Sequence, residues 1–210
     1  MLQGKEIMAR VRRDFKRHSK LYYYAFPSFL LAAIMFLIFW LGGDLDDMAD
    51  LFGGIVMKIG LKGLIITSLI MAAISWLSNL GGRGEGSFRD FLISFYKKDN
   101  PDWEKKAVQK AGEKIASKYY NVFAWIQIRA VLGMVVLSFL QLLLLKLFIA
   151  VFSLTPVVTA FFSLSLIIGN IILYGYFKST VAHVVYCAET GQDSGDARVE
   201  KEEGAGSYMK

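Results

Sequence analysis

The chain has 210 residues, 55% of them hydrophobic, and a formal net charge of +6. Its apolar residues form four long blocks, roughly 22–42, 55–78, 123–153 and 157–178, and about 20 such residues cross the hydrocarbon core of a bilayer. The blocks exclude an ordinary soluble domain. They predict an all-α, polytopic membrane protein with four transmembrane helices, because membrane strands would alternate polar and apolar residues.

The charge is distributed unevenly along the chain. Residues 1–24 hold seven Lys/Arg against two acids, and residues 81–120 hold nine against six. The connector after the first span is acidic, and the connector between the third and fourth spans has no charge. The positive-inside rule therefore predicts that the N-terminus, the 81–120 segment and the C-terminus are cytoplasmic. Anionic lipid head groups account for the basic excess, so we expect no nucleic-acid partner.

The expected organisation follows from these blocks. It consists of a basic cytoplasmic arm (1–21), a first transmembrane hairpin (22–80), a cytoplasmic amphipathic and helical loop (81–120), a second transmembrane hairpin (121–187) and a disordered acidic tail (188–210). The tail is polar and glycine-rich, a composition that buries too little apolar surface to fold.

The basic arm leads into aromatic residues and then into the first span. Tyr22, Tyr23 and Tyr24 fit the aromatic belt at a membrane interface. The span is expected to end at the two glycines 42 and 43, where helix propensity is low. The arm's basic side chains are expected to contact lipid head groups: Arg10, Arg12, Arg13, Lys16, Arg17 and Lys20. In the second span, Ser68, Ala72, Ser75 and Asn79 share one helical face and predict a packing seam.

The cytoplasmic loop contains two distinct patterns. Residues 81–87, GGRGEGS, lack the Lys-Ser/Thr ending of a phosphate-binding loop, so nucleotide binding is not expected. The segment that follows, SFRDFLISFYKK, has an apolar stripe at helical spacing: Phe88, Phe91, Leu92, Phe95 and Tyr96. This stripe predicts an amphipathic helix that lies on the membrane surface or docks onto a partner protein. Both alternatives stay open at this stage.

A helix start signal follows at DNPDWEKK. Asn100 suits a capping position, Pro101 the first turn, and Asp102 and Glu104 the positive end of the helix dipole. No helix-breaking pattern occurs between there and Phe152. We therefore expect one long helix, with a cytoplasmic stalk as its first part and the third span as its second.

The second hairpin has polar residues inside apolar spans. Two polar stripes are expected to face each other across it, one with Gln127, Ser138 and Gln141 and the other with Thr159, Ser163 and Asn170. The residues expected to make interhelical polar contacts are Gln127, Ser138, Gln141, Lys146, Ser163 and Asn170. Counting from the SLTP connector at about 1.5 Å per residue brings Gln141 level with Asn170 and predicts a hydrogen bond between them. The same count puts Lys146 level with Ser163, inside the outer hydrocarbon layer. Lys146 is the one charge that topology does not explain.

The sequence contains none of the common catalytic or metal-binding motifs considered below. Cys187 is the only cysteine, which excludes an intramolecular disulfide and a thiolate cluster. The two histidines, His18 and His183, lack metal-ligand spacing, and neither a G-x-S-x-G nor an H-E-x-x-H motif occurs. We expect no enzyme activity, no catalytic residue, no metal and no cofactor.

The functional expectation is a non-catalytic integral membrane subunit, or an assembly or scaffold factor, of a larger membrane machine of the secretion or conjugative-transfer type. The expected location is a bacterial inner membrane. The expected partners are anionic lipids and either other membrane subunits or further copies of the chain. Two alternatives stay open, a small channel or facilitator and an immunity or exclusion protein that acts within the membrane.

Overall fold

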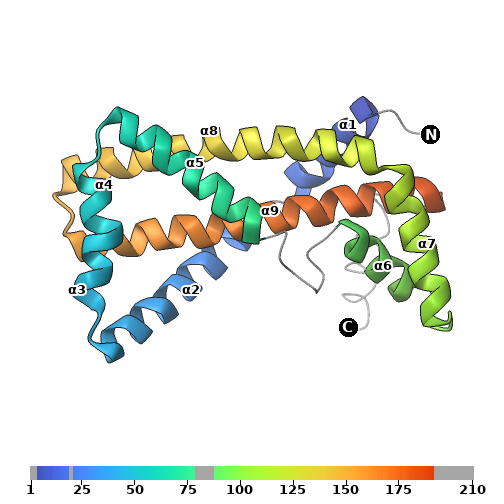
Figure 1. Cartoon of the computed structure of the whole chain (residues 1–210), viewed down its shortest axis with the longest axis horizontal. Coiled ribbons are helices and arrows are strands. Elements are labelled where there is room, and N and C mark those ends of the chain that lie inside the picture. The colour runs from blue at the N-terminus through green and yellow to red at the C-terminus, as the bar shows by residue number, and fades with distance from the viewer. Residues whose placement is uncertain (1–3, 19–20, 79–87, 192–210) are drawn as a thin grey trace, which may run out of the picture. The chain divides into compact units, whose positions relative to one another are not determined.

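The structure is a computed structural model of the whole chain, and the description covers residues 4–18, 21–78 and 88–191. All regular secondary structure in these ranges is helical. Four helices are long and apolar enough to cross a membrane, which confirms the all-α class and fits an integral membrane protein. They are α2 (Leu21–Gly42), α5 (Leu61–Ser78), α8 (Tyr120–Phe152) and α9 (Pro156–Thr190) (Figure 1).

The chain divides into two compact units. Unit 1 comprises Met1–Ser19, Gly82–Gln127 and Tyr176–Lys210, and unit 2 comprises Lys20–Gly81 and Ile128–Gly175. The helices α8 and α9 contribute residues to both units.

In unit 2, the first hairpin has a helical connector. Helix α2 ends at Gly42, and Gly43 takes a left-handed φ of +82°, a conformation that suits glycine. The acidic connector consists of α3 (Leu45–Met48), η1 (Ala49–Gly54) and α4 (Ile55–Lys58). It is helical because Met48, Phe52 and Val56 recur at every fourth position and pack into the cores of unit 2.

The second span begins later than expected. Residues 55–58 belong to α4, and Ile59 is extended with φ −69° and ψ 137°. The membrane-crossing helix α5 therefore starts at Leu61. Close contact between the two hairpins depends on Gly53, because a Cβ atom there would overlap the backbone carbonyl of Pro156.

In the second hairpin, α8 and α9 are joined by Ser153, Leu154 and Thr155, with Ser153 at φ 48°. Pro156 opens α9, where its missing N–H has no cost. Helix α9 continues to Thr190, beyond the apolar block at 157–178 and three residues beyond the hairpin boundary expected at residue 187. The tail expected over 188–210 is thus helical at its start, and residues 192–210 lie outside the described residues.

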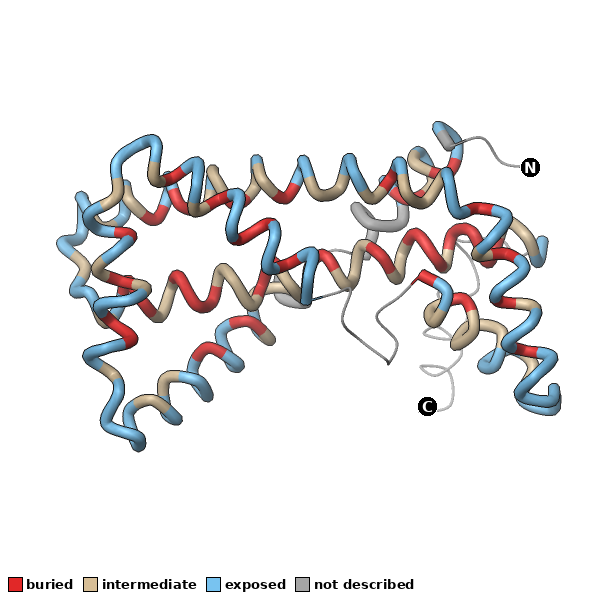
Figure 2. The backbone as a smooth tube through the Cα atoms, in the orientation of Figure 1, coloured by how far each residue is buried: buried red, intermediate tan, exposed pale blue. Residues whose placement is uncertain are grey.

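Unit 1 contains α1 (Gly4–His18), α6 (Phe88–Asp99) and α7 (Lys105–Lys118). These helices pack around a buried run of α9 that includes Val181, Val184 and Val185 (Figure 2). Helix α1 forms part of the arm for which no helix is predicted, and it buries Ile7 and Val11, which lie one turn apart. The glycine-rich segment 81–87 lies outside the described residues.

The prediction of one long helix from Asn100 to Phe152 is wrong. Helix α7 starts at Lys105, and the Asn100 side chain donates to the Tyr96 carbonyl at 3.1 Å, at the end of α6. Tyr119 separates α7 from α8 with φ −104° and ψ 9°, and α7 turns away from the first turns of α8 (Figure 1). The break has a tertiary cause, because it places the Tyr119 side chain in the buried cluster of unit 1.

Candidate functional site: a polar network between apolar helices

Polar side chains of α2, α8 and α9 meet in one network in unit 2. Asn170 is fully buried, and its Nδ2 donates to Gln141 Oε1 at 2.9 Å and to Ser138 Oγ at 3.2 Å. Gln141 Nε2 donates to the Tyr24 hydroxyl at 3.0 Å, and that hydroxyl donates to Asn170 Oδ1 at 3.3 Å. The two amides and the phenol form a closed ring of hydrogen bonds, the "amide–phenol ring". Because lipid offers no hydrogen-bond partners, buried amides in a membrane need such mutual pairing.

Tyr24 reaches the amide–phenol ring because its neighbour on α9 is a glycine. A Cβ atom at Gly169 would lie 2.9 Å from two ring carbons of Tyr24, so a larger residue would displace the phenol. From its sequence position, Tyr24 is expected in the interfacial aromatic belt, and its role in the amide–phenol ring is not predicted. The available signal was the Gly-Asn pair at 169 and 170, which puts a small residue beside an amide within an apolar helix.

Lys146 on α8 interacts with the C-terminal end of α4. Its Nζ donates to the backbone carbonyl of Ile59, the residue that follows the last turn of α4. The last carbonyls of a helix have no partner within the helix and carry the negative end of its dipole, so a cation is favourable there. This contact gives a structural reason for the charge that topology leaves unexplained.

The remaining residues of the two expected stripes lie outside the amide–phenol ring. Ser163 is buried, and its hydroxyl donates to the Thr159 carbonyl at 2.8 Å, within α9. Gln127 belongs to unit 1 and is half-buried. Of the six predicted residues, the structure therefore brings three together, Ser138, Gln141 and Asn170, and gives Lys146 a separate partner.

The small-residue face of α5 is buried in unit 2. Ser68, Ala72 and Ser75 are all nearly inaccessible, and the two hydroxyls donate to carbonyls one turn earlier at 2.6 and 2.9 Å. Ala72 packs in a cluster with Met134 and Tyr174. These residues form a packing seam, as expected, while Asn79 lies outside the described residues.

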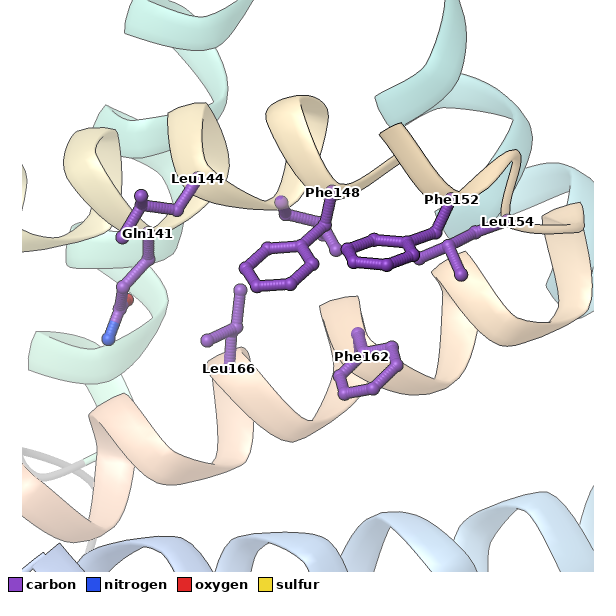
Figure 3. Close-up of a pocket in the computed structure, with 8 residues that line it drawn as sticks. Gln141, Leu144, Phe148, Phe152, Leu154, Phe162 and Leu166 are labelled. Atoms are coloured by element: carbon purple, nitrogen blue, oxygen red, sulfur yellow. The ribbon is translucent and has the colours of Figure 1, made fainter. Parts of the chain in front are cut away.

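An apolar pocket of about 360 Å³ lies between α8 and α9 near their connector (Figure 3). Phe148 and Phe152 stack along its α8 side, with ring centroids 5.5 Å apart, and Phe162 and Leu166 line its α9 side. Among its lining residues only Gln141 is polar, and that amide is already bonded in the amide–phenol ring. A pocket with this lining can accept hydrocarbon but offers no reactive group.

In unit 1, the apolar stripe of α6 packs against the protein's own core. Its members are buried or half-buried in one cluster: Phe88, Phe91, Leu92, Phe95 and Tyr96. The ring of Phe88 stacks on Phe123 of α8 at 4.2 Å, and Phe95 meets His183 of α9 edge-on at 5.3 Å. The structure thus gives this face a partner inside the chain, while its docking to lipid or to another protein stays a prediction.

Tyrosines connect the end of α6 to α9. The Tyr186 hydroxyl donates to Asp99 Oδ2 at 2.8 Å, and the Tyr186 ring meets Tyr96 edge-on at 4.8 Å. Burial raises the pKa of the Tyr96 hydroxyl above its usual value, and the nearby Glu189 carboxylate adds to the effect. Tyr96 therefore stays neutral at physiological pH and acts as a packing residue.

A second polar contact joins α7 to the end of α9. Lys118 Nζ lies 2.7 Å from Glu189 Oε1 and 2.8 Å from Oε2, and the Tyr119 hydroxyl donates to the same carboxylate. The carboxylate thus pairs with the last residue of α7 and with Tyr119, the residue at the break between α7 and α8.

Of the six basic residues expected to contact lipid head groups, three on α1 have side chains that the structure describes. Arg12 and Arg13 are exposed on α1, and Arg10 pairs with Glu6 at 3.4 Å. Lys16 and Arg17 lie within α1 without described side chains, and Lys20 lies outside the described residues. Their contact with lipid head groups stays a prediction.

The buried thiol of Cys187 lies near a histidine side chain. Cys187 is buried, with its Sγ 3.6 Å from Nε2 of His183, one turn earlier on α9. Among the residues that the structure describes, no group of three or more His, Cys, Asp or Glu side chains could hold a metal ion.

Comparison with known protein families, with characterised proteins and with solved structures gives no significant match.

Proposed function

We propose that the chain is a non-catalytic integral subunit, or an assembly factor, of a larger membrane machine of the secretion or conjugative-transfer type in a bacterial inner membrane. The observation that carries this proposal is the uncovered apolar face of α2, of whose crossing segment only 11% is buried. Six of its large apolar side chains are at least half exposed: Phe26, Leu30, Leu37, Ile38, Trp40 and Leu41. In a membrane, such a face contacts lipid or another helix.

The polar groups of the spans support a structural role. The amides of Gln141 and Asn170 bond to each other and to Tyr24, and Lys146 bonds to a helix-end carbonyl. Polar groups engaged in this way hold helices together and do not provide a row of ligands for a permeating ion. This arrangement favours a subunit over a small channel or facilitator.

The proposed orientation has both termini and the 81–120 segment in the cytoplasm, on the basis of the basic residues in the arm and the loop. Single cysteines at Lys97→Cys and Asp46→Cys test it, with buried Cys187 replaced by serine. A membrane-impermeant maleimide should label position 46 in intact spheroplasts and position 97 only in inverted vesicles. The reverse labelling pattern would overturn the orientation.

Purification of the tagged full chain from native membranes in mild detergent, followed by native mass spectrometry, tests the function. We expect one defined set of partner subunits in fixed stoichiometry. Leu37→Ala combined with Ile38→Ala should weaken their retention, whereas Leu143→Ala on α8 should not. A homo-oligomer without other subunits would support the channel, and a monomer under all conditions would support the immunity or exclusion protein, so either result would contradict the proposal.

A further inference from the structure

Helix α7 has one apolar and one basic face. Its apolar face is buried through Val108, Gly112 and Ile115. Four lysines recur at every fourth position and are exposed: Lys106, Lys110, Lys114 and Lys118. Residues four apart lie on the same side of a helix, so these side chains form a continuous row, the "lysine ridge".

Only one end of the lysine ridge is neutralised by the described part of the chain. Lys118 pairs with Glu189, whereas Lys106, Lys110 and Lys114 form no ion pair with a described residue. The nearby Glu113 accepts a hydrogen bond from Gln109 and pairs with Arg89. The ridge is therefore a strongly positive surface that fits a run of carboxylates.

The chain itself supplies such a run in the sequence that follows α9, and the last turn of α9 contacts one end of the ridge. Glu189, which binds Lys118, is one residue from the end of α9 at Thr190. The sequence from 193 to 203 then contains five acids, Asp193, Asp196, Glu200, Glu202 and Glu203, against two bases, Arg198 and Lys201. We propose that the lysine ridge of α7 is the docking site for this acidic segment, 193–203.

The geometry permits this contact. The ridge extends about 18 Å from Lys106 to Lys118, and the 13 residues between Thr190 and Glu203 reach up to about 45 Å when extended. A short tether raises the effective concentration of the segment at the ridge to the millimolar range. Each exposed ion pair contributes little to the free energy, and exposed charges farther apart than the Debye length of ~8 Å at physiological salt are largely screened. The contact is therefore reversible and salt-sensitive.

The same geometry favours the tethered segment over lipid head groups as the occupant. Helix α8 has 33 residues and is therefore about 50 Å long, whereas the hydrocarbon core is about 30 Å thick. When the connector after Phe152 lies at the far interface, the end of α8 next to α7 extends about 20 Å beyond the hydrocarbon. A docked acidic segment would compete with any external acidic partner for the ridge.

Carbodiimide cross-linking of the full chain in nanodiscs of neutral lipid, with mass spectrometry of the peptides, tests the proposal. We expect amide links from Lys106, Lys110 and Lys114 to acids of 193–203, and their loss at high salt. The triple variant E200K/E202K/E203K should lose most of these links, as should K106E/K110E/K114E. A chain that carries both triple substitutions should form the links again, now from lysines at 200, 202 and 203 to glutamates at 106, 110 and 114.

Thermal unfolding shows whether the charge-reversal variants stay folded, which is expected because all three ridge positions are exposed. K97E/K98E serves as the matched control, since these lysines are also exposed, on α6, and it should leave the links unchanged. Equal linking of the acidic segment to Lys97 and Lys98 would overturn the proposal. Failure of the combined variant to restore the links would also do so, as would links that persist at high salt.

Discussion

Replacing Gln141 with leucine should loosen the contact between α2, α8 and α9. The change removes two hydrogen bonds of the amide–phenol ring, one from Asn170 Nδ2 at 2.9 Å and one to the Tyr24 hydroxyl at 3.0 Å. Hydrogen bonds between membrane helices contribute about 0.6 kcal/mol on average and up to about 1.7 kcal/mol. Two lost bonds therefore predict a decrease of about 1–3 kcal/mol in the free energy of unfolding.

The assay is reversible unfolding of the purified chain in mixed micelles with increasing SDS, followed by circular dichroism. Leu143→Ala is the control, because Leu143 lies two residues from Gln141 on α8, is 37% exposed and has no polar group to contribute to the amide–phenol ring. A double-mutant cycle of Gln141→Leu with Tyr24→Phe isolates the pair and should give a coupling above about 0.5 kcal/mol. Equal stability of Gln141→Leu and Leu143→Ala would refute the reasoning.

Three further substitutions test the remaining contacts by the same unfolding measurement. Lys146→Met removes the charged donor to the end of α4 and should cost about 1.5–3 kcal/mol; an unchanged midpoint would show that the cap has no stabilising role. Gly169→Ala forces a Cβ against the Tyr24 ring and should lower the free energy of unfolding by about 1–3 kcal/mol. Gly133→Ala is its control, because a Cβ at that position has no atom within 4 Å, and it should be neutral or stabilising. Similar effects at the two glycines would contradict the close approach. Leu92→Ala leaves a cavity at a fully buried position of unit 1 and should cost about 2–5 kcal/mol, whereas exposed Lys97→Ala should have little effect. A loss below that of Lys97→Ala would show that the α6 stripe is not packed in the core.

In the hairpin of α8 and α9, counting residues from the connector predicts which residues lie at the same depth. Two helices joined by a three-residue connector run antiparallel with a fixed rise per residue. Depth along one helix therefore sets depth along the other, and Gln141 is expected beside Asn170. The hydrogen bond between them has the partners expected from this count.

Partners from other parts of the chain do not follow from such counting. Tyr24 is 146 residues from Asn170, and Ile59 is 87 residues from Lys146. Their contacts depend on how α2 and α4 pack beside the second hairpin. Gly53 and Gly169 make that packing possible by leaving room for a backbone and a phenol ring.

In unit 1 as well, the sequence does not predict which surface an apolar helix face packs against. The spacing of apolar residues identifies which face of α6 is buried. That face could pack equally well against a membrane, another protein or the chain's own core, because all three are apolar. The sequence alone therefore leaves the covering of Leu92 open, and the tertiary structure assigns it to the core of unit 1. The break at Tyr119 has the same origin, because no glycine or proline requires it and burial of the tyrosine does.

The sequence by itself determined the four apolar spans and the register of the second hairpin, since hydropathy and helical rise are local properties. Only the tertiary structure decided which polar groups pair and which apolar faces are covered, since those contacts join residues far apart in the chain.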